Sequence, residues 1–332
     1  MRRWLQLFRA QTGFATYYTV VIPYLFAGGD FLKALALLPV LLMLHYATFG
    51  HNSVMDYWYD VKDVHKQHHP LVKGVVDLRK AHQVIHTMLI IVLIILAVLT
   101  LSISPSPAIA LAFLLAYTVF GHAYNDGLDK NTIHSWIPIS LCFTSLGVYG
   151  WFLGSSEFNI YLVLLAVVLF SSIFYQIAFE GNLKDICVEH TLLNVLAEEV
   201  GCVRSDRGTI IVYRGPKFSW LRIFVDTIIL SVIIGLCRTG VWSWVALGLL
   251  LATSVVQTAW ITSMNMRLNS ILRDELLEYF GKIEAIQFFR VMTVVVRDLN
   301  TLLMYVVLFS MGVGYFILMN RVLWGSKWGP RV

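Results

Sequence analysis

Long apolar stretches recur along this chain, and each approaches the roughly 20 residues that an α-helix needs to cross the hydrocarbon core of a bilayer. Hydrophobic residues make up 58% of the sequence and charged residues only 14%, whereas soluble domains carry about a quarter charged residues. Backbone groups inside lipid must form hydrogen bonds within the membrane-embedded structure, so helices are expected. The alternation typical of a membrane barrel is absent. The sequence therefore predicts an all-α, polytopic transmembrane helical bundle.

The apolar stretches predict about nine transmembrane helices in a single domain over residues 1–332. We expect these helices at residues 12–28, 31–51, 84–103, 107–124, 136–153, 160–179, 220–237, 241–262 and 301–319. Turn-forming phrases, such as GGD at residues 28–30 and SPSP at residues 104–107, separate neighbouring helices.

Lysine and arginine are concentrated before the first expected helix and in the loops after the second, fourth, sixth and eighth. The positive-inside rule then places the N-terminus and these loops in the cytoplasm. Nine helices would put the C-terminus outside, although its own basic residues favour an even number. The net charge of +5 follows from this topology and from attraction to anionic membrane lipids, and we expect no nucleic-acid partner.

The first polar feature lies at the end of the second expected helix, in HNSVMDYWYD at residues 51–60. Asn52, Asp56 and Asp60 are four residues apart, a spacing that puts them on one helix face over about 12 Å. Carboxylates stacked this way near lipid repel each other, and a divalent cation removes the repulsion. Mg²⁺ is the natural candidate because it prefers oxygen ligands and commonly binds one or two carboxylates together with substrate phosphates.

A second acidic phrase, EGNLKDICVE at residues 180–189, ends the sixth expected helix. Asp185 and Glu189 repeat the four-residue spacing, and the expected topology puts both phrases at the cytoplasmic end. Taken alone, the second pair would be an ordinary solvated helix end, so its interpretation depends on the first stripe. Two such clusters suit a diphosphate bridged by Mg²⁺ ions, which neutralise its charge as it leaves.

The loop after the first stripe reads HHPLVKG at residues 68–74. With it, the sequence resembles the UbiA superfamily of intramembrane prenyltransferases, which carries N-x-x-x-D-x-x-x-D and then approximately R-P-L-x-x-G. The family's second motif, N-x-(K/R)-D-I-x-x-D, is similar to NLKDICVE at residues 182–189. Tyr124 and Lys130 are similar to a Tyr and a Lys that the family carries in the loop after its fourth helix. RAQT at residues 9–12 resembles the family's R-x-x-T at the first helix.

The resemblance implies helices around a central cavity, a Mg²⁺-bound prenyl diphosphate and transfer of its prenyl group to an aromatic or lipid-like acceptor. The implied metal ligands are Asn52, Asp56, Asp60, Asp185 and Glu189, and the four carboxylates are the implied catalytic residues. The implied diphosphate-binding residues are Asn52, His69, Lys73, Tyr124, Lys130, Asn182 and Lys184. The expected partners are prenyl diphosphate, a hydrophobic acceptor and membrane lipids.

Several features depart from the family pattern. Glu189 stands where the family has Asp, and His69 stands where it has Arg, so that a fixed charge becomes titratable near neutral pH. The segment at about 190–217 is longer than in the family. We expect a helix at residues 191–200 and a strand at 209–213 within a small hairpin, which caps the cavity.

Two further expectations concern the cytoplasmic side. The four cysteines show no metal-binding or disulfide spacing. Residues 265–289 mix charged and apolar residues, which predicts an amphipathic helix at the membrane interface.

Two other functions remain open. A UbiA-fold enzyme could instead carry out polyprenyl-phosphate glycosyl or phosphoribosyl transfer, or terpene cyclisation, and the sequence does not choose among these reactions. A non-enzymatic transporter would also carry acidic residues in its membrane helices. Carrier folds often contain internal repeats, and this sequence shows none.

Overall fold

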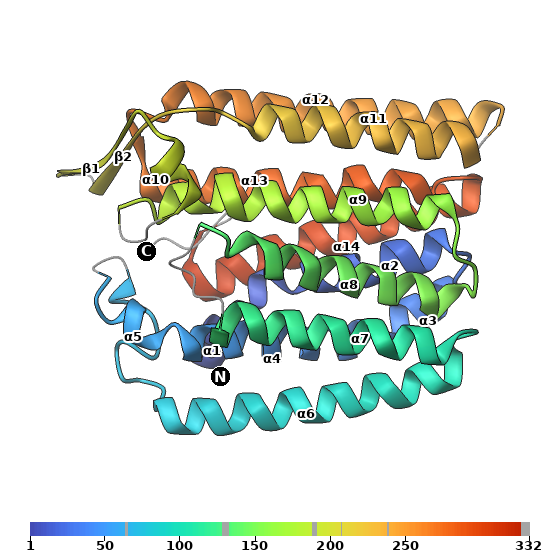
Figure 1. Ribbon diagram of the computed structural model, residues 1–332, viewed down its shortest axis with the longest axis horizontal. Helices are drawn as coiled ribbons and strands as arrows, with labels where there is room; N and C mark the ends of the chain where they lie inside the picture. Colours follow the sequence, from blue (N-terminus) through green and yellow to red (C-terminus); the bar gives the residue numbers. More distant parts are fainter. Residues whose placement is uncertain (64–65, 128–132, 188–190, 207, 238, 327–332) are drawn as a thin grey trace. The chain divides into compact units, whose positions relative to one another are not determined.

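The computed structural model describes residues 1–63, 66–127, 133–187, 191–206, 208–237 and 239–326. Contacts divide the chain into two compact units. Unit 1 comprises Met1–Gly127, Ser145–Phe158 and Met311–Val332, and unit 2 comprises Leu128–Thr144 and Asn159–Ser310. Both units are built mainly of α-helices (Figure 1).

Unit 1 is helical along most of its described length. Its elements are α1 (Arg2–Leu7), the 3-10 turn η1 (Ala10–Thr12), α2 (Gly13–Phe26), α3 (Phe31–Ala36), α4 (Leu38–Met55), α5 (Tyr57–Asp60), α6 (Leu78–Ile103), α7 (Pro107–His122) and the π turn η3 (Ala123–Gly127). Aspartates begin two of these helices. The carboxylates of Asp30 and Asp77 accept the backbone N–H groups of Lys33 (2.9 Å) and Lys80 (2.8 Å), which satisfies helix donors that would otherwise lack partners.

Unit 2 combines long helices with a small sheet. Its elements are α9 (Ile160–Tyr175), the π turn η4 (Gln176–Glu180), the 3-10 turns η5 (Gly181–Lys184) and η6 (Thr293–Val295), α10 (Leu192–Leu196), β1 (Glu199–Ser205), β2 (Gly208–Arg214), α11 (Ser219–Cys237), α12 (Val241–Arg267), β3 (Ile271–Leu272) and α13 (Arg273–Met292). Two further helices, α8 (Trp136–Gly154) and α14 (Leu299–Trp324), contribute residues to both units.

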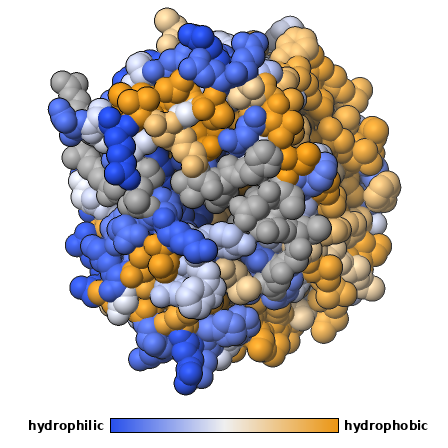
Figure 2. Space-filling view, turned by 60° about the vertical axis from the view of Figure 1, so that its left-hand side comes forward, coloured by the Kyte–Doolittle hydropathy of each residue, from blue (hydrophilic) through white to orange (hydrophobic). Residues whose placement is uncertain are grey.

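Eight helical segments of the described chain are long and apolar enough to cross a membrane, and α2, with 14 residues, makes about nine. Large apolar side chains point outward on them: Ile94, Phe224 and Val255 are 59%, 64% and 68% exposed. Such exposure is unfavourable in water but not in lipid. Figure 2 shows hydrophobic residues covering the helix flanks and hydrophilic residues gathered around the connecting segments. The predicted transmembrane helical bundle is confirmed, and the protein is an integral membrane protein.

The segment after the second acidic phrase supplies β1 and β2 of a sheet with the order β1-β2-β3, and β3 comes from the connection between α12 and α13. β1 pairs antiparallel with β2 from Glu199–Arg214 to Ser205–Gly208, so the predicted hairpin is present. The helix expected at residues 191–200 is shorter than predicted, since α10 ends at Leu196 and β1 begins at Glu199. Val200 lies in the paired strand, where a β-branched side chain is more favourable than in a helix.

A disulfide joins Cys187, within the second acidic phrase, to Cys202 of β1, with 6.0 Å between their Cα atoms. The expectation that the cysteines form no disulfide is therefore wrong. The two cysteines are 15 positions apart in the sequence, and only the folded hairpin brings them within bonding distance. Cys142 and Cys237 take no part in a disulfide.

α13 lies beside α12 and runs in the opposite direction. Near its start, the hydroxyl oxygen of Tyr279 lies 2.6 Å from Oγ of Ser263, and near its end Nε of Arg290 donates to Oγ of Ser254 at 3.1 Å. Later residues of α13 thus contact earlier residues of α12, so the two helices are antiparallel. The expected interfacial helix is thus a packed helix of unit 2, because its polar side chains find partners on neighbouring helices rather than in water.

The two ends of unit 1 are in contact. The backbone carbonyl of Leu323 in α14 accepts hydrogen bonds from Nη2 of Arg2 (2.9 Å) and from Nε2 of Gln6 (2.8 Å). This contact brings the N-terminal helix α1 against the end of α14.

Candidate active site

The first acidic stripe keeps its helical register across a break between two helices. α4 ends at Met55 and α5 begins at Tyr57. The N–H of Asp56 still donates to the carbonyl of Asn52, and the N–H of Asp60 to the carbonyl of Asp56, both at 2.9 Å. Because the four-residue bonding pattern continues, the three side chains share one face, as the spacing predicts.

Asp60 is the most buried carboxylate of this stripe, with 6% of the residue exposed. Nζ of Lys66 lies 3.1 Å from its Oδ1. Burial raises the pKa of Asp60, the positive charge of Lys66 opposes that rise, and the nearby charge of Asp56 adds to it. The two carboxylates are therefore close enough to repel, which is the condition that a bound cation relieves.

The amide of Asn52 is oriented by a neighbouring π turn. Its Nδ2 donates to Oδ1 of Asn125 at 2.9 Å, and Nδ2 of Asn125 donates to Nδ1 of His51 at 3.3 Å. Asn125 belongs to η3, beside the predicted diphosphate-binding residue Tyr124. π turns in helical proteins occur frequently at functional sites. The amide oxygen of Asn52 is the atom that a hard cation would bind.

His69 lies in the loop after the stripe. Within the described chain, its buried Nδ1 has no hydrogen-bond partner. Burial lowers the pKa of His69 to about 3, helped by the positive charges of Arg9, Lys66 and His68. The expectation that this side chain titrates near neutral pH is therefore wrong, and the imidazole is neutral there. Lys73, further along the loop, is exposed.

Arg9 is a further basic residue of this site, and the sequence did not predict it as a diphosphate-binding residue. It lies close enough to act electrostatically on both Asp60 and His69. Its backbone adopts a left-handed conformation, with φ of 48°, at the start of η1, which turns the chain between α1 and α2. The RAQT phrase was the sequence signal for this residue.

The second acidic phrase does not continue a helix. After α9 the chain passes through the π turn η4 and the 3-10 turn η5, which ends at Lys184. Asp185 has φ of −108° and ψ of 2° and starts a turn. Asp185 is therefore not in a helix, and the predicted helical face that it would share with Glu189 does not begin at this residue. Glu189 and Lys130 both lie outside the described residues.

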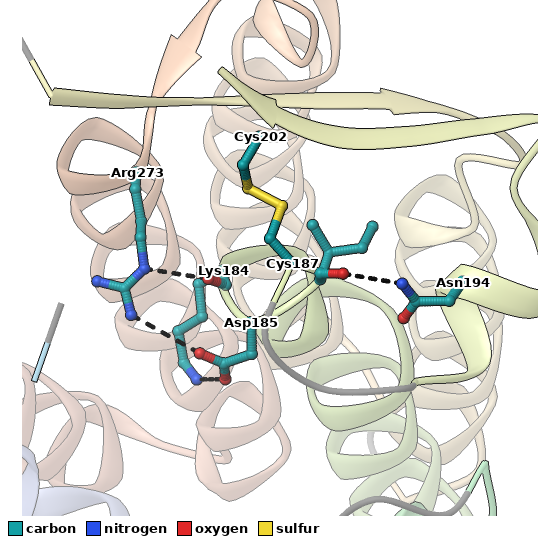
Figure 3. The surroundings of a disulfide bond; sticks show 7 residues. Lys184, Asp185, Cys187, Asn194, Cys202 and Arg273 are labelled. Atoms are coloured by element: carbon teal, nitrogen blue, oxygen red, sulfur yellow. Dashed lines mark hydrogen bonds and ion pairs between the residues drawn. A yellow bond between two sulfur atoms is a disulfide. The ribbon is translucent and has the colours of Figure 1, made fainter. Parts of the chain in front are cut away.

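Asp185 is held between two basic side chains, as Figure 3 shows. The ammonium of Lys184 pairs with Oδ2, and Nη2 of Arg273 lies 3.7 Å from Oδ1. Nε of Arg273 also donates to the carbonyl of Lys184 at 3.0 Å. The predicted diphosphate ligand Asn182 donates its amide to the carbonyl of Ala178 at 3.3 Å.

The oxygen-bearing side chains of the first stripe can supply only part of the coordination shell of a Mg²⁺ ion. Within the described ranges, no three His, Cys, Asp or Glu side chains form a group able to hold a metal ion. The stripe in unit 1 instead offers two carboxylates and an amide oxygen. Mg²⁺ is usually bound by one or two carboxylates while phosphates and waters complete its shell. These residues therefore suit an ion that binds together with a diphosphate.

Unit 2 also contains a buried charge cluster that the sequence did not reveal. Nη1 of Arg222 lies 3.1 Å from Oε2 of Glu180 and 3.0 Å from Oε1 of Glu284. Arg222 and Glu180 are almost completely buried. Asp226 and Arg290 form a neighbouring buried pair, 4.0 Å apart. These charges lie on three different helical segments, η4, α11 and α13, so no local spacing in the sequence could have indicated their partners.

No protein-family model matches the chain, and no curated protein matches its sequence. Solved structures match its fold. A UbiA homologue from Archaeoglobus fulgidus bound to GPP and Mg²⁺ is 15% identical, with a TM-score of 0.57, and the match covers 88% of this chain and 99% of that one. A UbiA homologue from Aeropyrum pernix K1 is 14% identical, with a TM-score of 0.54, covering 82% and 94%. A structure of digeranylgeranylglyceryl phosphate synthase is 16% identical, with a TM-score of 0.52, covering 88% and 97%. The predicted resemblance to the UbiA superfamily is confirmed at the level of the fold.

Proposed function

We propose that this chain is a divergent member of the UbiA superfamily that acts as an intramembrane prenyltransferase. It moves a prenyl group from a Mg²⁺-bound prenyl diphosphate to a hydrophobic acceptor, either aromatic or lipid-like. The fold supports the class of protein, since solved UbiA homologues with this fold bind GPP, DMAPP and Mg²⁺.

The observation that carries the proposal is the stripe of Asn52, Asp56 and Asp60. These three oxygen-bearing side chains keep one face across a break in the helix, and Asp60 stays buried despite a raised pKa. Stacked, partly buried carboxylates are unfavourable by themselves. Their retention is explained if a divalent cation binds there.

The neighbouring groups suit the anion that would accompany this cation. The buried Nδ1 of His69, which has no partner within the described chain, can donate to a phosphate oxygen as part of a neutral ring. Arg9, close to the same residues, adds a permanent positive charge. The further diphosphate contacts that we propose are Asn52, Lys73, Tyr124, Lys130, Asn182 and Lys184.

The second acidic phrase completes the proposed site. We assign Asp185 and Glu189 as metal ligands alongside the stripe, and the segment at about 190–217 as a cap. The N-terminus and the loops that carry these residues lie on the cytoplasmic side, where lysine and arginine are concentrated.

The proposed reaction breaks the bond between the allylic carbon and the diphosphate oxygen, and joins that carbon to the acceptor, which loses a proton. A bound Mg²⁺ would supply positive charge that stabilises the diphosphate as a leaving group. The carboxylates of Asp56, Asp60 and Asp185 would hold the ion, while the basic side chains would orient the phosphate oxygens. The surrounding lipid-exposed helices exclude water from the reactive carbon.

Binding of GPP by the purified protein, measured with and without Mg²⁺, tests this proposal. We expect Mg²⁺-dependent binding in the wild type and its loss in Asp56→Ala and Asp185→Ala. Glu157→Gln, which neutralises an exposed carboxylate outside the proposed site, should bind like the wild type. Absence of binding at every Mg²⁺ concentration would refute the diphosphate function and favour a transporter. Loss in only one of the two alanine variants would refute a site shared by both acidic phrases.

A further inference from the structure

The turn that carries Asp185 is anchored by side chains from outside it. The carbonyl of Lys184 accepts a hydrogen bond from Nε of Arg273 at 3.0 Å, and the carbonyl of Ile186 accepts one from Nδ2 of Asn194 at 2.8 Å. Figure 3 shows both contacts on either side of the Asp185 carboxylate. The position of this carboxylate therefore depends on the elements that supply these anchors.

The three-stranded sheet connects two anchors of the turn. Ile211, in the central strand β2, pairs with Cys202 of β1 on one side and with Ile271 of β3 on the other. Cys202 is bonded to Cys187 at the end of the turn, and Arg273 is the first residue after β3. The disulfide and the Arg273 contacts thus reach the turn from one hydrogen-bonded sheet.

The disulfide attaches β1 covalently to the turn that carries Asp185. Six of the seven residues of β1 are exposed, so the strand has little apolar packing of its own. β2 and β3 pair over only two positions. A two-stranded hairpin is marginally stable in water. Opening the disulfide would therefore leave β1 held mainly by its pairing with β2.

Both bonded cysteines are exposed, so a soluble thiol can reach them. In the reaction, a dithiol reductant gives two electrons and two protons to the Cys187–Cys202 bond. Two cysteine thiols form, and the reductant becomes a disulfide. Cytoplasmic thiol systems favour reduction of disulfides. A disulfide on the proposed cytoplasmic side of the membrane therefore suits a regulatory role.

We propose that the sheet is a redox-sensitive clamp on the second acidic phrase. With the Cys187–Cys202 bond formed, the clamp holds Asp185 in position for the Mg²⁺–diphosphate complex. Reduction releases β1 and lets the turn move, which weakens that binding. The inference deepens the proposed function and rests on it, because Asp185 is there a metal ligand.

Full-length protein, purified without reductant and then treated or not treated with dithiothreitol, tests the clamp. We expect two free thiols before treatment and four after it. Hydrogen–deuterium exchange of residues 182–187 should increase on reduction, and the Mg²⁺ concentration for half-maximal GPP binding should rise roughly tenfold, as for other residues that support metal ligands. Cys202→Ser should match the reduced protein in both conditions. Cys237→Ser, which changes a cysteine outside this disulfide, should keep the wild-type response.

Four free thiols in protein purified without reductant would overturn the clamp. So would equal exchange of residues 182–187 and equal Mg²⁺ dependence in the two redox states. If neither state binds GPP, the proposed function fails, and exchange alone then decides the clamp: an increase on reduction supports it, and no change refutes it.

Discussion

Replacing Arg290 by Met should lower the stability of unit 2 strongly. This side chain is completely buried, and each of its five N–H groups donates a hydrogen bond. The acceptors are Oγ of Ser254, Oε1 of Gln257, Oε1 of Gln287, the carbonyl of Ile223 and Oγ1 of Thr227, at 2.6 to 3.1 Å. Met fills a similar volume but donates none of these bonds.

The expected magnitude follows from the charge that the substitution leaves behind. Asp226 is completely buried, and its Oδ2 lies 4.0 Å from Nη1 of Arg290. The side chains that donate hydrogen bonds to Asp226, those of Ser171, Ser172 and Gln287, are neutral. Removing one partner of a buried ion pair costs about 3–5 kcal/mol. At about 2–4 °C per kcal/mol for large domains, the unfolding midpoint should fall by roughly 10 °C.

Thermal unfolding in detergent, followed by tryptophan fluorescence, measures this change. The double variant Arg290→Met/Asp226→Asn no longer carries the unpaired charge and should recover part of the loss. Arg321→Met, which changes an exposed arginine of α14, should stay within about 0.5 kcal/mol of the wild type. If Arg290→Met unfolds at the wild-type midpoint, or if Asp226→Asn recovers nothing, the reasoning about the buried pair is wrong.

Two other predictions concern the candidate site and the topology. Protons compete with Mg²⁺ for Asp60, whose pKa is raised mainly by burial, so Mg²⁺-dependent GPP binding should weaken as pH falls through a midpoint above the usual value of about 3.9. Lys66→Met removes a charge that lowers this pKa and should move the midpoint to higher pH; a shift to lower pH would contradict the assignment. Fluorescent-protein fusions at the two chain ends should report the same side of the membrane, because α1 contacts the end of α14, and opposite sides would contradict that contact.

Features set by local periodicity were predictable from the sequence. The stripe of Asn52, Asp56 and Asp60 is one, because a helix places residues four apart on one face whatever surrounds it. The hairpin containing β2 is another, since β-branched residues on either side of a turn favour strand pairing. The predicted continuation of a helix through Asp185 failed because contacts from Arg273 and a disulfide, both distant in the sequence, hold that residue in a turn.

The sequence by itself determined that this protein crosses a membrane as a helical bundle, because lipid requires about 20 apolar residues per span and internally satisfied backbone groups. Tertiary structure decided what depends on neighbours far along the chain. It packed α13 against α12, since its Arg290 finds partners inside unit 2. It made His69 neutral, since burial controls its pKa. It also joined Cys187 to Cys202, since a disulfide requires closeness in space, which spacing along the chain does not specify.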